Sequence, residues 1–89
     1  MRDMDTNTDP QALGLRALVW TLEEPDRAMR LIDITGLTPS DLRARAGQPA
    51  VLAACLSFLE AHESDLVACA RDLDVPPPAL VAAREALER

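Results

Sequence analysis

Hydrophobic positions along this chain recur at helical spacing and are interrupted at regular intervals by proline and glycine. In the first segment one apolar stripe is formed by Ala12, Leu15, Leu18, Val19 and Leu22. Spacings of three and four residues place these side chains on one face of a helix. Asp9 offers an N-cap, Pro10 fits the first helical position, and the next proline requires an end near Glu23. The pattern therefore predicts a first helix over 10–23.

The clearest local signal lies between the second and third predicted helices. The second helix opens at Pro25 and ends before Gly36, which suits the left-handed position that follows many helices. Thr38 then offers an N-cap, with Pro39 at the first helical position and Asp41 as the acidic third residue of a capping box. These residues predict a sharp turn followed by a short helix to about residue 46.

The remaining apolar segments predict three more helices. Pro49 opens the fourth, whose length of about 13 residues suits a core helix but not a membrane span. Ser64 is expected to cap a fifth helix, and the prolines at 76–78 separate it from a last helix over 79–87. The chain thus predicts a compact all-α bundle of five or six short helices.

Length and composition fit one small domain. The 89 residues are 48% hydrophobic but only 2% aromatic. Alanine and leucine supply most of the apolar residues, and both favour helices. We expect a single helical domain over 9–89, preceded by a flexible tail over 1–8. The chain shows no signal-peptide pattern and no apolar run of membrane length, so we expect a cytoplasmic location.

The charge balance narrows the classes of partner. The chain carries nine positive and fifteen negative side chains, a net charge of −6. Such a chain has no field that attracts nucleic-acid phosphates or anionic membrane surfaces, so neither is an expected partner. An acidic surface does suit a basic protein, including one that itself handles nucleic acid.

Groups able to perform catalysis are scarce. The sequence contains one histidine, two cysteines, and no tyrosine or lysine. His62-Glu63 begins like a zinc-protease motif, but Leu66 stands where the second histidine ligand is required. No phosphate-binding loop or nucleophile–base spacing is present. We therefore expect no enzymatic activity, no metal and no cofactor. His62 is interpreted as a helix C-terminal residue that interacts with the last carbonyl groups.

Cys55 and Cys69 are the candidate functional pair, because each lies seven residues from His62 in the predicted turn between two helices. An antiparallel hairpin places the two thiols at a similar height. An internal disulfide is conceivable. It is not favoured, because packed helix axes lie about 8–10 Å apart and a disulfide needs Cα atoms within about 7 Å.

The sequence neighbours of the two cysteines differ. Cys55 is surrounded at helical spacing by apolar residues, so we expect it to be buried and inert. Cys69 has leucines on one side but Asp65 and Asp72 on the other, so we expect it at the edge of the apolar stripe, within reach of solvent or a second protomer. The aspartates are expected to raise the pKa of its thiol, which argues against fast reactivity. The alternative is that both cysteines are core residues.

Trp20 is a weak candidate for a protein-binding residue. It lies about 100° around the first helix from Val19, at the margin of the apolar stripe. Tryptophan is enriched in the hot spots of protein interfaces. The alternative interpretation is partial burial beneath the N-terminal tail or the second helix.

Several short motifs resemble a known family. The most specific is Thr35-Gly36-Leu37-Thr38-Pro39, and the others are Ala17-Leu18-Val19-Trp20, Glu24-Pro25, Arg30-Leu31, Leu42-Arg43, Phe58-Leu59 and His62-Glu63. Over roughly residues 12–87 the chain resembles a family of small alphaproteobacterial proteins classed as a domain of unknown function. That family includes a negative switch of topoisomerase IV decatenation.

The resemblance implies a cytoplasmic, non-enzymatic inhibitor that binds the ParC subunit of topoisomerase IV and is activated when oxidation links protomers by disulfides. In this sequence only Cys55 and Cys69 can supply such a link, which implies a disulfide-linked homodimer when oxidised. Of the two, Cys69 is the better candidate for the intermolecular bond. The alternative function is a constitutive helical adaptor or structural protein with both cysteines in its core.

Overall fold

Proline occupies the first position of five of the six helices in the computed structural model, which describes residues 9–89. The helices are α2 (Pro10–Leu22), α3 (Pro25–Thr35), α4 (Pro39–Arg45), α5 (Pro49–Glu60), α6 (Glu63–Leu73) and α7 (Pro77–Leu87). Proline suits a helix start because its missing N–H has no partner there in any case. No strand occurs among the described residues, so the all-α prediction is confirmed. The tail predicted over 1–8 lies outside the described residues.

The predicted helix caps are present. The Asp9 carboxylate accepts a hydrogen bond from the backbone N–H of Ala12 at 3.0 Å. Thr38 and Asp41 exchange side-chain-to-backbone hydrogen bonds at 3.0 and 3.1 Å, which complete the predicted capping box. Gly36 follows α3 with a φ of 75°, in the left-handed region that costs other residues about 1–2 kcal/mol. The turn between α3 and α4 is therefore fixed by local chemistry.

Two helices begin earlier than the sequence predicts. Ser64 is not the N-cap of α6, because His62 holds that position and the helix begins at Glu63. The His62 carbonyl already accepts two backbone hydrogen bonds from the first turn, and no side chain caps it. Instead, the negative charges of Glu63 and Asp65 in that turn interact favourably with the positive end of the helix dipole. The last helix begins at Pro77 rather than Ala79, because proline is favoured at a first helical position.

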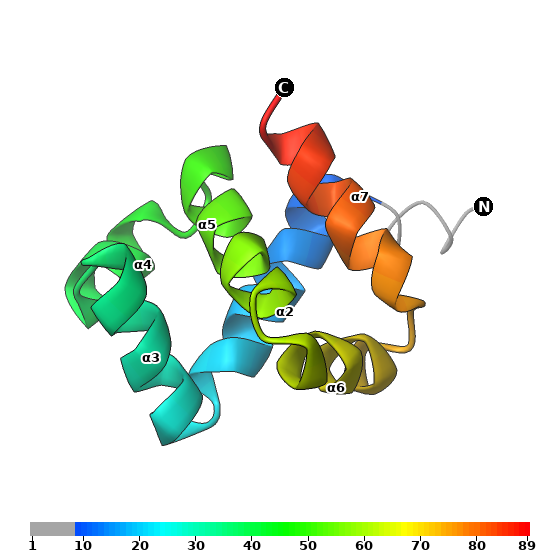
Figure 1. Cartoon of the computed structure of the whole chain (residues 1–89). Helices are drawn as coiled ribbons and strands as arrows, with labels where there is room; N and C mark the ends of the chain where they lie inside the picture. The colour runs from blue at the N-terminus through cyan, green and yellow to red at the C-terminus, as the bar shows by residue number, and fades with distance from the viewer. Residues whose placement is uncertain (1–8) are drawn as a thin grey trace.

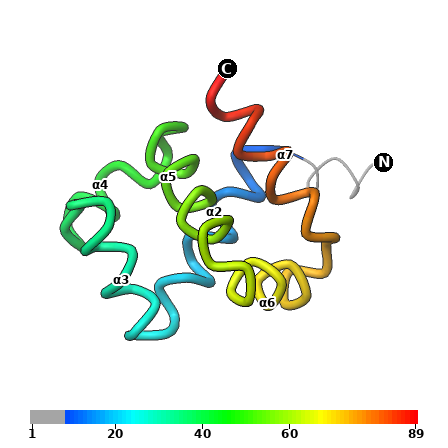
Figure 2. The backbone as a smooth tube through the Cα atoms, in the orientation of Figure 1, coloured from blue at the N-terminus to red at the C-terminus, as the bar shows by residue number. Residues whose placement is uncertain are grey.

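The centre of the fold is formed by α2, α5 and α7, which pack against one another (Figure 1). α6 contacts all three of these helices, and α3 and α4 lie on the side of α5 away from α7 (Figure 2). Seven of the twelve residues of α5 are buried, as expected for an apolar helix enclosed by its neighbours. None of the helices in the described part of the chain has the length and apolar character needed to cross a membrane.

The close packing of α2 requires a residue without a side chain at Gly14. A Cβ atom at this position would lie 3.1 Å from Leu52 Cβ and 3.3 Å from Leu87 Cδ1. Carbon atoms in contact prefer separations of about 3.5–4.0 Å. Gly14 therefore lets α2 approach α5 and α7 more closely than another residue would.

The buried face of α2 differs from the predicted one. Leu15, Val19 and Leu22 of the predicted stripe are 43%, 53% and 37% exposed. The core side of the helix instead presents Leu13, Gly14, Ala17, Leu18, Trp20 and Thr21. The helix is apolar on most sides, so spacing alone did not distinguish its faces. The close approach at Gly14 selects this side, and Thr21 tolerates burial because its hydroxyl donates to a backbone carbonyl at 2.8 Å.

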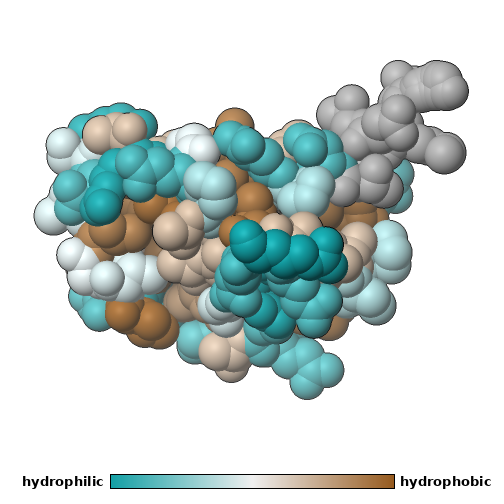
Figure 3. Space-filling model, turned by 90° about the horizontal axis from the view of Figure 1, so that it is seen from above, coloured by the Kyte–Doolittle hydropathy of each residue, from teal (hydrophilic) through white to brown (hydrophobic). Residues whose placement is uncertain are grey.

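Hydrophobic residues also reach the surface in separate places. On the face seen in Figure 3, hydrophobic patches alternate with hydrophilic residues. The large exposed hydrophobic residues of the described chain are Leu15, Val19, Leu22, Met29, Ile34 and Val67. Scattered apolar residues are normal on a surface, whereas those gathered on one face are candidates for contacts with a partner.

Replacing Gly14 by valine is expected to lower the free energy of unfolding by about 1–3 kcal/mol, because the added atoms overpack the α2–α5 contact. Chemical denaturation monitored by circular dichroism measures this difference. Gly47→Ala is the matched control, since no atom lies within 4 Å of a Cβ at Gly47, and its effect should stay within about 0.5 kcal/mol. Equal effects of the two substitutions would contradict the proposed close approach.

Candidate functional site

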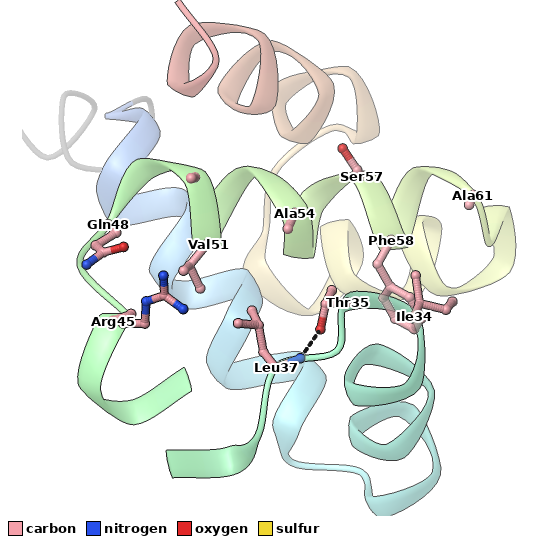
Figure 4. Close-up of a pocket in the computed structure, with 11 residues that line it drawn as sticks. Ile34, Thr35, Leu37, Arg45, Gln48, Val51, Ala54, Ser57, Phe58 and Ala61 are labelled. Atoms are coloured by element: carbon pink, nitrogen blue, oxygen red, sulfur yellow. Dashed lines mark hydrogen bonds between the residues drawn. The ribbon is translucent and has the colours of Figure 1, made fainter. Parts of the chain in front are cut away.

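An open groove runs along α5 beside the connection between α3 and α4 (Figure 4). Its volume is about 510 Å³, and seven of its eleven lining residues are apolar. The lining residues are Ile34, Thr35, Leu37, Arg45, Gln48, Ala50, Val51, Ala54, Ser57, Phe58 and Ala61. A concave, mostly apolar surface with a few polar groups is the usual form of a binding site. We call it the α5 groove.

Small residues form the α5 side of the groove. Ala50, Ala54, Ser57 and Ala61 are spaced by four, three and four residues, so they share one face of the helix. The distance between packed helices depends on the side chains at the contact. Because these side chains are short, a further helix can approach this face of α5 closely.

The opposite side of the groove comes from the end of α3 and the turn after it. Ile34 is 61% exposed, and Figure 4 shows Leu37 pointing from the turn toward α5. The Thr35 hydroxyl donates to the Leu31 carbonyl at 2.7 Å and accepts from the backbone N–H of Leu37 at 3.2 Å. Together with the left-handed Gly36, these bonds fix the direction of the chain, so the side chain of Leu37 borders the groove.

Polar residues mark one end of the groove. The guanidinium of Arg45 extends toward Val51, and Gln48 lies at the same end (Figure 4). The other end, at Phe58 and Ala61, is apolar. The α5 groove is therefore apolar along most of its length and carries a positive charge at one end.

The chemistry of the groove suits binding rather than catalysis. Arg45 is the only ionisable residue among the described residues that line it, and a guanidinium does not exchange protons near neutral pH. Across residues 9–89, no cluster of three or more histidine, cysteine or acidic side chains is arranged to hold a metal ion. The groove can hold an apolar partner that places a carboxylate near Arg45.

Cys55 lies in the core as a free thiol. Its residue is 1% exposed, which confirms the expectation that it is buried. Its Sγ lies 3.6 Å from Oγ1 of Thr21. Burial raises the pKa of the Cys55 thiol to about 11, and the Thr21 contact lowers it only in part. The thiol is therefore protonated at neutral pH, and a protonated thiol is a poor nucleophile.

The expectation that Cys69 lies at the edge of the stripe, within reach of solvent, is wrong. Cys69 is a free thiol that is 0% exposed. The two aspartates that suggested a solvent-facing side of α6 bond neighbouring helices. Asp65 pairs with Arg30 of α3 at 3.2 Å, and Asp72 accepts a hydrogen bond from the indole N–H of Trp20 of α2 at 2.7 Å. The pKa of the Cys69 thiol is raised to about 12, mainly by burial and only in small part by Asp72.

Trp20 lies beneath α3, which agrees with the alternative interpretation of its sequence position. It is 7% exposed. The guanidinium carbon of Arg27 lies 3.6 Å from the centre of the indole ring, and Arg27 also donates to the Trp20 carbonyl at 2.6 Å. Because its N–H bonds Asp72 of α6, the indole connects α2, α3 and α6. Little of the ring remains available to a partner.

His62 interacts with the end of α5. Its Nδ1 lies 2.9 Å from the Phe58 carbonyl oxygen, and its ring centre lies 4.8 Å from that of the Phe58 ring. The expected contact with a terminal helix carbonyl is therefore confirmed. His62 contacts the last turn of α5 and is the N-cap of α6, so its role is structural.

Comparison with known proteins places the chain in a family. Over residues 7–89 it matches the family described as "Protein of unknown function (DUF3572)", and it belongs to that family. No curated protein matches the chain. No solved structure matches it either.

The α5 groove was not predicted from the sequence. One signal was present, since the small residues from Ala50 to Ala61 recur at helical spacing. In a helix as apolar as α5, such residues are expected inside the core as readily as at its surface. Only the position of α3 and its turn shows that this side of α5 is open.

The pKa values of the thiols predict a loss of stability at alkaline pH. The unfolded chain releases cysteine protons above about pH 8.5, whereas the folded chain keeps them up to about 11 for Cys55 and about 12 for Cys69. Stability is therefore unaffected below that unfolded-state pKa and falls as pH rises toward the folded-state values. We expect a fall of about 1.4 kcal/mol per pH unit for each thiol.

Denaturation series between about pH 7 and pH 11 test this dependence. The chain has no tyrosine or lysine, so few other groups titrate in the window where the thiols act. Cys55→Ala and Cys69→Ala should each remove part of the slope. A free energy of unfolding that stays constant across this range would contradict the buried, protonated state of the thiols.

Proposed function

We propose that this protein is a non-enzymatic helical adaptor that binds a helix of another protein in the α5 groove. The observation that carries the proposal is the groove itself, an open apolar surface between α5 and the turn after α3. The two cysteines are core residues in this proposal, in agreement with their exposed fractions of 1% and 0%. The adaptor is therefore constitutive and needs no oxidation to act.

The shape of the groove favours a helix as the bound element. The small residues from Ala50 to Ala61 cover twelve positions of α5 and its C-cap, a length of about 16 Å or three helical turns. An amphipathic helix lays its apolar face into a groove of this kind through anchors three and four residues apart. Ile34 and Leu37 provide the opposite apolar side, and Arg45 favours a partner with an acidic residue at the corresponding end.

Photo-crosslinking from within the groove tests this function. A photoreactive amino acid at Ala54 should give one discrete crosslinked protein in the native cells, because a bound helix passes within reach of that position. The same amino acid at Met29, which is 57% exposed on α3, is the matched control. Ile34→Asp combined with the Ala54 probe should abolish the crosslinked species by placing a charge in the apolar wall. Identical crosslinks from Ala54 and Met29 would contradict binding at the groove.

A second candidate function is inhibition of topoisomerase IV decatenation in the cytoplasm, through binding of the ParC subunit. Two observations favour it. The segment at 35–39 and the other quoted motifs resemble the family of NstA, a negative switch of decatenation. The net charge of −6 suits a basic surface that otherwise binds DNA.

Redox control of that inhibition requires a rearrangement of the fold. An intermolecular disulfide at Cys69 can form only after α6 separates from α2, because Cys69 is fully buried and Trp20 bonds Asp72 beside it. A disulfide-linked homodimer would therefore represent a state in which this contact is open. The two candidates differ in whether such opening occurs under mild oxidation.

Thiol chemistry and decatenation assays separate the two candidates. The adaptor function predicts that both thiols resist alkylation in the folded protein and react after unfolding in guanidinium chloride. It also predicts that mild oxidation gives no covalent dimer on non-reducing gels. The redox inhibitor predicts a covalent dimer that is lost in Cys69→Ser or Cys55→Ser variants, and stronger inhibition of decatenation by the oxidised protein.

Calorimetric titration with purified ParC provides the third measurement. Binding that is equal for reduced and oxidised protein would support a constitutive inhibitor. The topoisomerase candidate is eliminated if neither form binds ParC or changes decatenation. The Ile34→Asp variant shows whether any binding uses the α5 groove.

A further inference from the structure

Three of the six large hydrophobic residues exposed in the described chain lie on one face of α2. Leu15, Val19 and Leu22 are separated by four and three residues, so they align along the helix. Val19 is the most exposed of the three at 53%. These residues, here called the α2 stripe, form an apolar surface that no other part of residues 9–89 covers.

A shallow hollow lies beside the α2 stripe, toward the end of α6. Its volume is about 490 Å³, and its lining includes Leu15 and Val19 together with Leu73 of α6. Glu23 also lines the hollow, as does Arg16, whose guanidinium donates to the Leu73 carbonyl at 3.0 Å. Because these two residues are seven positions apart, they share one edge of α2, with a positive charge near one end of the stripe and a negative charge near the other.

We propose that the α2 stripe is the interface of a non-covalent homodimer, in which α2 packs antiparallel against α2 of a second copy. A two-fold axis through such an interface places one edge of α2 beside the same edge of the partner's α2, and the two helices run in opposite directions. Arg16 of each copy then faces Glu23 of the other, and Leu15 of each copy faces Leu22 of the other.

The positions of these residues agree with a single axis. The midpoint between Leu15 and Leu22 and the midpoint between Arg16 and Glu23 both fall within one residue of Val19. Val19 of one copy then packs against Val19 of the other at the centre. This complementarity of charge and apolar surface selects a second copy of the chain rather than an unrelated protein, because the same edge supplies both members of each ion pair.

The apolar residues and the ion pairs have different effects on the dimer. Burial of the α2 stripe supplies most of the affinity. Ion pairs near solvent contribute little affinity but set the register and the antiparallel direction. One pair of helices as short as α2 buries less than the roughly 800 Å² per partner of a standard stable interface. The dimer should therefore dissociate at micromolar concentrations.

This dimer is independent of the α5 groove and of the cysteines. The groove is built from α3, α4 and α5, and both native thiols are buried. The α2 stripe thus offers association without oxidation, which differs from a disulfide-linked homodimer.

Sedimentation equilibrium over about 10 µM to 1 mM protein tests the proposal. The expected result for the native chain is a reversible monomer–dimer equilibrium. Val19→Asp should raise the dissociation constant at least about a hundredfold, and Glu23→Arg about tenfold, by burying or opposing a charge at the interface. Met29→Asp is the matched control, since Met29 is 57% exposed on another helix, and should change the constant less than about threefold.

A crosslinking measurement gives an independent readout of the two-fold axis. Val19→Cys introduces an accessible thiol beside its symmetry mate, so copper-catalysed air oxidation should convert most of the protein into a disulfide-linked dimer, while Met29→Cys should give little. A native chain that stays monomeric throughout the concentration range overturns the proposal. It is equally overturned by a dimer that Val19→Asp leaves intact, or by equal crosslinking of the two cysteine variants.

Discussion

The contact between Gly14 of α2 and Leu52 of α5 sets the arrangement on which the rest of the molecule depends. A Cβ at Gly14 would lie only 3.1 Å from Leu52, so the two backbones meet there more closely than larger residues permit. This contact decides which face of α2 is buried. It brings Thr21 against Cys55 on the inner side and leaves Val19 on the outer side, where it is available to a second copy.

The position of α6 follows from bonds between charged and aromatic residues rather than from apolar packing alone. Trp20 donates to Asp72 and Arg30 pairs with Asp65, so each aspartate bonds a neighbouring helix, although the side chain of Asp72 remains 51% exposed. Cys69, which lies between these two aspartates on α6, is fully buried. Oxidation of this thiol therefore requires α6 to separate from α2, and that local opening costs free energy.

The two candidate surfaces are built from different elements and have different chemistry. The α5 groove combines a face of small residues with an apolar turn and the positive charge of Arg45. The α2 stripe combines an apolar line with opposite charges at Arg16 and Glu23. One surface fits a helix of another protein and the other fits a second copy. A dimeric adaptor with two grooves would bind a repeated or dimeric target with higher avidity than a single copy.

The sequence by itself determined that the chain forms helices and where most of them begin and end, because the signals for those ends are local. Asp9, Thr38 with Asp41, and Gly36 each act within a few residues, and the structure places them as predicted. The sequence did not determine which face of an almost wholly apolar helix is buried, nor that Asp72 binds an indole 52 residues away. Only the tertiary structure decided these features, because they depend on contacts between distant segments. The α5 groove, the α2 stripe and the burial of Cys69 all arise from such contacts.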